Sequence, residues 1–331
     1  MSVTGNELIF PRPGAPESGT EPIQAPSETS FTDTFGQLLP PAKFLKTAQG
    51  RAAYYELAPL TSQDKAESDV KSTPHCVVLI HGVQTPALGM FPLSSALRKS
   101  FPDATLVILE LWGHGLSDAI PVPHTPSLFQ GLLGQLLDSL DWPSAHLVGY
   151  SFGAVVSAGY TANHPERVQS LTLVAPAGFI KSSEFSPEEQ RHLKHDSDEV
   201  AAKQWVFNFL EGGDLIVPSD WKQRVERGEV VAQAVKHWQM LEHPGHIPTV
   251  VGVLRDGGAL DFHAEYLRTV KTGVPSLVVL GELDSLSSEK EVREHGFNNI
   301  NVVPQAGHAV VRDNASEVEV FIRDFWTKFG R

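Results

Sequence analysis

The sequence predicts an α/β protein built on a doubly wound, mostly parallel sheet with an inserted helical segment. From residue 43 onward, short apolar runs that suit strands buried on both faces alternate with amphipathic helices. The alternation stops between residues 179 and 250, where polar helical sequence with scattered aromatic residues takes over, and then resumes. With 41% apolar and 20% charged residues, the chain is of ordinary globular composition, which excludes collagen-like, coiled-coil and wholly disordered structures. Such a pattern predicts a sheet between helical layers, carrying a lid.

Four segments follow from this pattern. Residues 1–42 hold seven prolines and few apolar residues, so they are expected to be a flexible or surface-wrapping extension without a core of its own. Residues 43–178 and 251–331 are expected to form the two parts of the sheet domain, with residues 179–250 as a helical lid between them. Within the first part, the polar stretch 61–73 is predicted to be an exposed loop.

The individual elements follow from local patterns. The predicted strands are residues 51–57, 77–80, 105–109, 146–148, 170–174, 275–280 and 301–303. Apolar residues spaced by three and four predict a helix ending near Leu140, with Thr125 as its cap and Pro126 in its first turn. A second helix is predicted over residues 152–163. A capping box from Ser316 to Glu319 is predicted to open the last helix.

Charge and cysteine content exclude several classes of function. Acidic residues outnumber basic ones 39 to 26, and no stretch is dense in Lys and Arg, so a nucleic-acid-binding surface is not expected. No apolar run approaches the roughly 18 residues of a membrane-spanning helix. Cys76 is the single cysteine, which excludes an intrachain disulfide and a cysteine-based zinc site. The first residues lack the features of a signal peptide, so a cytoplasmic protein is expected.

One short motif points to nucleophilic catalysis. Gly149-Tyr150-Ser151-Phe152-Gly153 has the pattern G-x-S-x-G, in which a serine occupies a strained turn between a strand and a helix. The pattern occurs by chance often enough that its context decides. Here a predicted strand ends just before it and a predicted helix begins at Phe152. Ser151 is therefore the predicted nucleophile.

A serine nucleophile needs a base and a group that orients the base. His308 follows the last predicted strand, and Asp284 follows the strand before it, so both are expected at the edge where α/β sheets bind ligands. Glu282 is the alternative acid. The order Ser, Asp, His is the one used on this kind of sheet.

A tetrahedral intermediate also needs backbone donors for its oxyanion. The amide after the nucleophile, that of Phe152, is one predicted donor. The other is the amide of Val83, which follows His81-Gly82 at the end of a predicted strand. His81 itself is predicted to be a structural hydrogen-bonding residue.

Several motifs in one order resemble the α/β-hydrolase superfamily, in its branch of serine esterases and C–C-bond hydrolases. The motifs are His81-Gly82, residues 111–118 (LWGHGLSD), residues 149–153, residues 164–168 (HPERV), residues 281–284 (GELD) and Gly307-His308. The resemblance covers about residues 44–329. It implies that Ser151 is the nucleophile, His308 the general base and acid, Asp284 its orienter, and Val83 and Phe152 the oxyanion donors. One departure is Glu110, where many relatives have Asp; a structural role is expected for it.

The expected function is cofactor-free hydrolysis of a carboxylic ester, lactone or thioester of an apolar or aromatic small molecule. Three alternatives remain at this point: a C–C bond hydrolase acting on a diketone, a non-catalytic ligand-binding protein on the same fold, and a biosynthetic enzyme such as a chain-releasing thioesterase or a lyase. Serine at position 151 argues against epoxide hydrolase and dehalogenase chemistry, which use Asp there in this fold. The sequence does not indicate an oligomeric state.

Weaker patterns lie in the predicted lid. His192, His195 and Asp196, and separately His243 and His246, have spacings from which a metal site could be drawn, but solvated histidines and no metal are expected. The lid also carries aromatic residues that are predicted either to line a substrate pocket or to hold the lid to the sheet. These are Trp205, Phe207, Phe209, Trp221 and Trp238.

Overall fold

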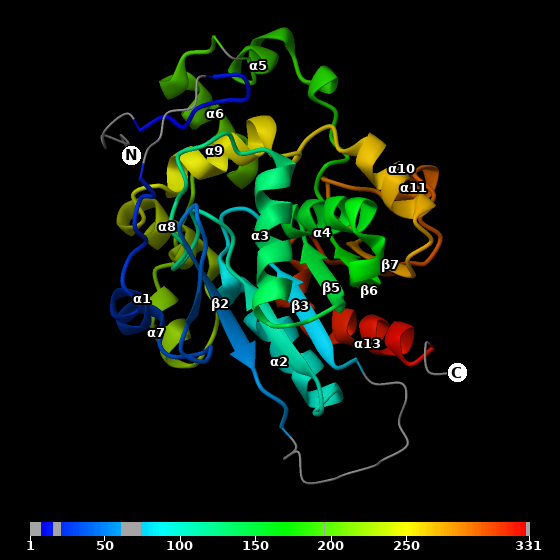
Figure 1. Ribbon diagram of the computed structural model, residues 1–331. Coiled ribbons are helices and arrows are strands. Elements are labelled where there is room, and N and C mark those ends of the chain that lie inside the picture. The colour runs from blue at the N-terminus through cyan, green and yellow to red at the C-terminus, as the bar shows by residue number, and fades with distance from the viewer. Residues whose placement is uncertain (1–7, 16–20, 61–73, 195, 329–331) are drawn as a thin grey trace.

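An eight-stranded sheet runs through the centre of the computed structural model, which describes residues 8–15, 21–60, 74–194 and 196–328 (Figure 1). Its order is β1-β2-β4-β3-β5-β6-β7-β8; β2 pairs antiparallel with both β1 and β4, and the pairs that link β4, β3, β5, β6, β7 and β8 are parallel. The strands are β1 (Lys43–Lys46), β2 (Arg51–Leu57), β3 (Cys76–Ile80), β4 (Thr105–Leu109), β5 (Ala145–Tyr150), β6 (Val168–Val174), β7 (Ser276–Gly281) and β8 (Ile300–Val303). The predicted mostly parallel sheet is confirmed. The predicted loop 61–73 lies outside the described residues.

Helices cover both faces of the sheet, and the central strand β3 shows why a strand in this position is apolar along its whole length. Val78 and Ile80 pack in the core beneath α3 (Pro126–Ser139) and α4 (Phe152–Asn163), and α10 (His263–Lys271) packs on α4. Val77 and Leu79 pack in the opposite core with α2 (Phe91–Ser100) and α13 (Ala315–Trp326). Successive strand residues point to opposite faces, so a strand covered on both sides needs apolar residues at every position.

The residues between β6 and β7 form a run of helices, most of them at one end of the sheet, with α5, α6 and α9 at the top of the view in Figure 1. The helices are α5 (Pro187–His192), α6 (Glu199–Glu211), α7 (Trp221–Glu226), α8 (Ala232–Glu242) and α9 (His246–Asp256), after a 3₁₀ turn at Ser182–Glu184. The predicted boundary at residue 250 falls inside α9, whose buried face is continuous from His246 to Leu254. We therefore extend the segment to the end of α9 and call residues 179–256 the lid segment, after the lid expected there.

The described part of the N-terminal extension lies against the rest of the molecule. Ile23 forms a β-bridge with Ala119, and a helix that the sequence analysis did not predict, α1 (Glu28–Phe35), follows it. Phe31 and Phe35 are buried, with ring centroids 5.1 and 6.1 Å from that of Trp238 in α8. The helix is short and polar apart from these two rings, so its tertiary contacts stabilise it more than its composition does.

The predicted start of the last helix is also wrong. Helix α13 begins at Ala315 after Asn314, so Ser316 lies inside its first turn and does not cap it. A short helix, α12 (Val310–Asp313), leads directly into α13 and leaves no extended residue at the predicted cap. Elsewhere, capping boxes form at Ser186 and at Ser288, the latter opening α11 (Glu289–Glu294). Within the described ranges, no helix has the length and apolar character needed to cross a bilayer.

Candidate active site

Ser151 occupies the turn between β5 and α4. Its backbone angles are φ 54° and ψ −115°, a region that non-glycine residues rarely adopt. The amide of Ser151 donates a hydrogen bond to the carbonyl of Val174 at 3.0 Å, which ties the turn to the neighbouring strand. The strained turn presents the serine hydroxyl at the carboxyl edge of the parallel strands, as predicted from the motif.

The glycines around Ser151 are packing requirements. A Cβ added at Gly149 would collide with the carbonyl of Gly153, and one added at Gly153 would collide with the carbonyl of Ile80. At Gly82, an added Cβ would lie 2.8 Å from the Cβ of Ser151. Strand β3, the loop that follows it and the start of α4 can therefore approach one another only without side chains at these positions.

His308 and Asp284 meet Ser151 at this edge in one hydrogen-bonded chain. His308 Nε2 lies 2.9 Å from Ser151 Oγ, and His308 Nδ1 lies 2.9 Å from Asp284 Oδ2. These partners assign the imidazole proton to Nδ1, which donates to Asp284 and leaves Nε2 to accept from the serine. The Asp284 side chain is fully buried, whereas that of His308 is 32% exposed. The arrangement links a buried carboxylate to a hydroxyl through a histidine that a substrate can reach.

The structure distinguishes the two candidate acids. Besides His308, Asp284 accepts the amide of Leu286 at 3.0 Å through Oδ1. Glu282 is exposed, and its Oε2 accepts from the backbone and side-chain amides of Gln305 at 2.8 and 3.1 Å. A Cβ at Gly281 would collide with the carbonyls of the loop carrying His308, so a glycine at the end of β7 lets the two loops meet.

Tyr150 packs behind the histidine. The centroid of its ring lies 5.3 Å from that of the His308 ring. The guanidinium carbon of Arg312 lies 5.5 Å from the centroid of the Tyr150 ring. Burial raises the pKa of Tyr150, an effect that the nearby Arg312 opposes, so the phenol stays protonated at neutral pH. The sequence analysis did not single out Arg312, because its place against Tyr150 depends on how α12 folds back over the sheet.

The two predicted oxyanion donors are Phe152, which directly follows Ser151, and Val83, which follows the Gly82 that packs against Ser151. Phe152 is the first residue of α4, where backbone N–H groups lack helical partners and carry the positive end of the helix dipole. The carbonyl of Gly82 and the N–H of Val83 belong to the same peptide, and the carbonyl oxygen lies 2.7 Å from His81 Nδ1. Because the N–H and C=O of a trans peptide point in opposite directions, the Val83 N–H points away from His81. Within the described chain, neither amide donates to a protein acceptor.

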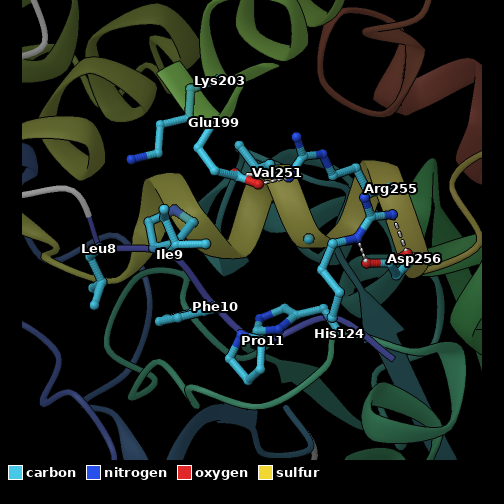
Figure 2. Close-up of a pocket in the computed structure, with 13 residues that line it drawn as sticks. Leu8, Ile9, Phe10, Pro11, His124, Glu199, Lys203, Val251, Arg255 and Asp256 are labelled. Atoms are coloured by element: carbon cyan, nitrogen blue, oxygen red, sulfur yellow. Dashed lines mark hydrogen bonds and ion pairs between the residues drawn. The ribbon is translucent and has the colours of Figure 1, made fainter. Parts of the chain in front are cut away.

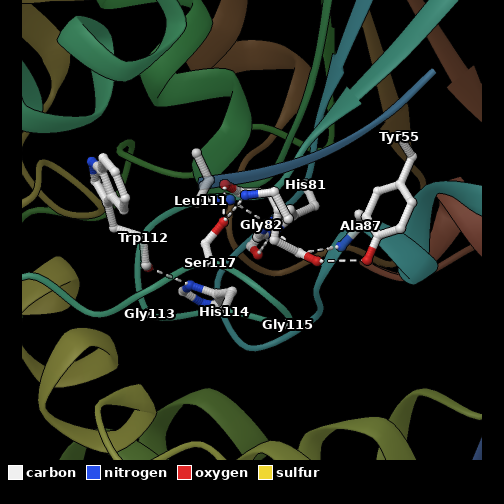
Figure 3. Close-up of polar contacts among 12 residues, drawn as sticks. Tyr55, His81, Gly82, Ala87, Leu111, Trp112, Gly113, His114, Gly115 and Ser117 are labelled. Atoms are coloured by element: carbon white, nitrogen blue, oxygen red, sulfur yellow. Dashed lines mark hydrogen bonds and ion pairs between the residues drawn. The ribbon is translucent and has the colours of Figure 1, made fainter. Parts of the chain in front are cut away.

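A buried polar cluster around Glu110 supports the loop that carries Val83, residues 81–87, which we call the oxyanion loop. Glu110, 1% exposed, accepts the amide of Ala87 at 2.7 Å and lies 3.5 Å from the hydroxyl of Tyr55. Figure 3 shows Ala87 and Tyr55 at the right of this cluster, beyond His81 and Gly82. The amide of Leu111 donates to His81 Nε2 at 3.0 Å. Burial, reinforced by the charge of Glu110, raises the pKa of Tyr55. Glu110 and His81 thus have structural contacts, and neither is hydrogen-bonded to Ser151.

The lid histidines at positions 243 and 246 are not solvated, contrary to expectation. They are 2% and 0% exposed, and they reach across to the backbone of residues 113–117: His246 Nδ1 lies 2.9 Å from the Gly113 carbonyl, and His243 Nε2 lies 2.9 Å from the Ser117 carbonyl. Burial lowers the pKa of His246 to about 3 and also lowers that of His243. These histidines therefore attach the lid segment to the sheet domain as neutral groups.

Among the described residues, the remaining lid histidines form no metal site. His192 is partly buried and stacks on Trp205 with centroids 5.7 Å apart, and His195 lies outside the described residues. In the ranges that the structure describes, no group of three or more His, Cys, Asp or Glu side chains could hold a metal ion.

The lid aromatics pack among themselves and on α1. Trp205 stacks on Phe209 at 5.6 Å, and both pack edge-on to Phe185. Trp221 contacts Phe35 of α1, and Trp238 packs on α1 as described above. These contacts favour the interpretation in which the aromatics hold the lid in place.

Two hollows in the described chain lie away from Ser151. A cavity of about 20 Å³ lies where the N-terminal segment crosses α9, and Phe10 stacks on His124 there (Figure 2). Beside it, Arg12 pairs with Asp256 at 2.7 Å. An open groove of about 560 Å³ runs between the start of α3, the end of α4 and α10. Neither is lined by a residue of the Ser151–His308–Asp284 chain.

Comparison with known proteins agrees with this architecture. A family model described as the alpha/beta hydrolase fold matches residues 76–214. The dihydrolipoyllysine-residue acetyltransferase components of the acetoin cleaving systems of Pseudomonas putida and Cupriavidus necator are 27% and 37% identical over 248 and 228 residues, or 73% and 66% of this chain. The matches cover 60% and 55% of those relatives, so the chain spans little more than half of their length.

Solved structures share the fold at lower identity. The enol-lactonase from Burkholderia xenovorans LB400 is 18% identical with a TM-score of 0.61, covering 86% of this chain and all of its own. The family model, the curated relatives and the sheet topology agree that the chain has the α/β-hydrolase fold.

Proposed function

We propose that this protein is a cofactor-free serine hydrolase that cleaves a carboxylic ester, lactone or thioester of an apolar or aromatic small molecule. The observation that carries the proposal is the unbroken hydrogen-bond chain from buried Asp284 through His308 to Ser151. Only an activated serine needs these three groups in this order, since a binding protein could use the same fold without them.

The geometry supports the following reaction. Ser151 Oγ attacks the carbonyl carbon while His308 Nε2 takes its proton, and the carboxylate of Asp284 stabilises the imidazolium that forms. The carbonyl oxygen becomes an oxyanion that accepts hydrogen bonds from the amides of Val83 and Phe152. When the intermediate collapses, the alcohol or thiol leaves with the proton from His308. Water then attacks the acyl-enzyme, giving a proton to His308, and Ser151 recovers its hydrogen as the carboxylic acid is released.

The names of the similar proteins support the substrate class. One is a lactonase, whose name describes a cyclic ester as substrate, and two are acetyltransferase components, whose names describe transfer of an acyl group. Both kinds of chemistry pass through attack on an acyl carbonyl.

The decisive experiment is intact-protein mass spectrometry after incubation with a fluorophosphonate probe. The wild type should gain one adduct, and Ser151→Ala should gain none, while the surface variant Ser183→Ala should label like the wild type. Turnover of any substrate by Ser151→Ala or His308→Ala should fall on the order of 10⁶-fold, by analogy with other triads. A folded wild type that neither labels nor hydrolyses a panel of p-nitrophenyl esters, lactones and thioesters would overturn the proposal.

The same panel, with a diketone added, tests the alternatives. Cleavage of a diketone in preference to every ester would indicate a C–C bond hydrolase, in which the same serine serves a different bond. Labelling without turnover of any panel member, together with a thermal shift on addition of an apolar ligand, would indicate a binding protein.

A further inference from the structure

One side chain of the lid reaches the oxyanion loop directly. Gln239 lies in α8 and is fully buried. Its Nε2 donates to the carbonyl of Gln84 at 2.5 Å, and its Oε1 accepts the amide of Gly115 at 2.8 Å. A single amide thus bridges the residue after Val83 and the Gly-His-Gly turn at residues 113–115.

The residue that Gln239 holds is in a strained conformation. Gln84 has φ 64°, a value that favours glycine, so surrounding contacts must hold it there. Its N–H donates to His114 Nε2 at 3.1 Å, while its C=O accepts from Gln239. Both polar groups of the Gln84 backbone are therefore bonded to side chains from distant parts of the chain, and Gln239 is the one supplied by the lid segment.

Holding Gln84 also holds the amide of Val83. The Gly82–Val83 peptide is oriented from one side by His81, which contacts the Gly82 carbonyl. The next peptide, between Val83 and Gln84, is oriented by His114, and the one after it by Gln239. With three successive peptides tied in this way, the backbone of Val83 has little freedom to rotate its N–H away from the site beside Ser151.

We propose that Gln239 is a positioning residue through which seating of the lid segment completes the oxyanion hole. The inference rests on the proposed function. Gln239 does not touch substrate; it acts through the Gln84 carbonyl on the Val83 amide. Its loss should therefore weaken stabilisation of the transition state more than binding of the ground state, because the oxyanion exists only after attack.

The test compares Gln239→Met with the wild type. Methionine keeps the length and shape of the side chain but removes both hydrogen bonds. Gln204→Met is the matched control, because Gln204 is an exposed lid glutamine whose side chain bonds only within α6, to Asn208. The readouts are kcat and KM for p-nitrophenyl butyrate and the rate constant for labelling by a fluorophosphonate, whose phosphoryl oxygen occupies the same oxyanion site.

For Gln239→Met, we expect kcat and the labelling rate to fall together by about 100-fold, with KM changed by less than about threefold. Gln204→Met should have the same kcat, KM and labelling rate as the wild type. If Gln239→Met folds and keeps kcat within about threefold of wild type, or raises KM at constant kcat, the assignment is overturned.

A second variant covers the case in which Gln239→Met does not fold. Gln239→Ala leaves room for water to bond the Gln84 carbonyl, so it is expected to fold and to show the same loss in kcat to a smaller extent. Unchanged kcat in Gln239→Ala contradicts the inference. These failures differ from failure of the proposed function, in which the wild type itself neither labels nor turns over ester.

Discussion

The two sides of the candidate active site are built in different ways. On the nucleophile side, Ser151 is held by its own neighbours: the strand before it, the helix after it, and glycines that let backbones touch. On the oxyanion side, residues 81–87 are held by buried side chains from elsewhere, Glu110, His114 and Gln239. The nucleophile side depends on the packing of neighbouring backbone, whereas the oxyanion side depends on hydrogen bonds between residues far apart in the sequence.

Because of this difference, the two sides should be sensitive to different kinds of substitution. A local turn is disturbed by changes in volume at a few adjacent positions, because the backbone has no room to relax. A buried polar network is disturbed by loss of any member, because each loss leaves a partner unsatisfied in a low-dielectric interior. Substitutions in the lid segment and changes in pH should therefore alter the stability and geometry of the oxyanion side. The glycine packing around Ser151 should be insensitive to both.

The largest effect should come from the carboxylate that orients His308. Asp284→Asn should lower kcat on the order of 10⁴-fold, since an amide can hold the wrong imidazole tautomer and cannot stabilise the imidazolium. Steady-state kinetics with the best ester of the panel measures this. Glu282→Gln is the control, and its kcat should stay within about threefold of wild type because Glu282 bonds Gln305 instead. The reverse result would assign the acid role to Glu282.

Next in size is removal of the buried carboxylate on the oxyanion side. Glu110→Ala should lower the free energy of unfolding by about 3 kcal/mol, because the Ala87 amide loses its acceptor and a cavity remains. Urea unfolding checks this, with exposed Glu166→Ala expected within about 0.5 kcal/mol of wild type. Equal stabilities for the two variants would show that the network adds little to the fold.

On the nucleophile side, Gly153→Ala should cost about 2 kcal/mol, because the new methyl group would collide with the carbonyls of Ile80 and His81. The control has the opposite sign: Gly131→Ala, in the middle of α3 with open space around it, should stabilise the protein by about 0.5–1 kcal/mol. Thermal unfolding distinguishes the two, and stabilisation by both would contradict the packing argument.

A smaller effect is the pH dependence of stability that each single buried histidine carries. Burial lowers the pKa of His246 to about 3 and that of His124 to about 4, from 6.5. Above 6.5 they are neutral in both states and contribute nothing. As pH falls below 6.5, the unfolded chain binds protons that the folded chain does not, so the free energy of unfolding decreases by up to about 1.4 kcal/mol per histidine per pH unit.

Urea unfolding at about pH 7.5 and about pH 5.5 measures this decrease. His246→Gln should lose less stability between the two values than the wild type does, whereas His164→Gln, on the surface, should behave like the wild type. An unchanged decrease in His246→Gln would mean that this histidine is protonated in the folded state at the lower pH.

Much of the fold was predictable because its elements depend on local sequence. Helix α4 has the predicted bounds, and β2, β3, β4 and β6 lie where apolar runs predict them, within two residues at each end. Two predictions about helices failed because tertiary contacts decided the outcome. Helix α1 exists because Phe31 and Phe35 find partners in α7 and α8, and the start of α13 is displaced because α12 runs into it.

The sequence by itself determined the strand and helix periodicities, the strained turn at Ser151 and the sheet edge where His308 and a carboxylate would meet, because steric and hydrophobic patterns act between near neighbours. Only the tertiary structure decided that Asp284 rather than Glu282 faces His308, that His243 and His246 are buried, and that Gln239 holds the oxyanion loop. Each of these depends on which distant backbone arrives within hydrogen-bonding distance, and no local pattern records that.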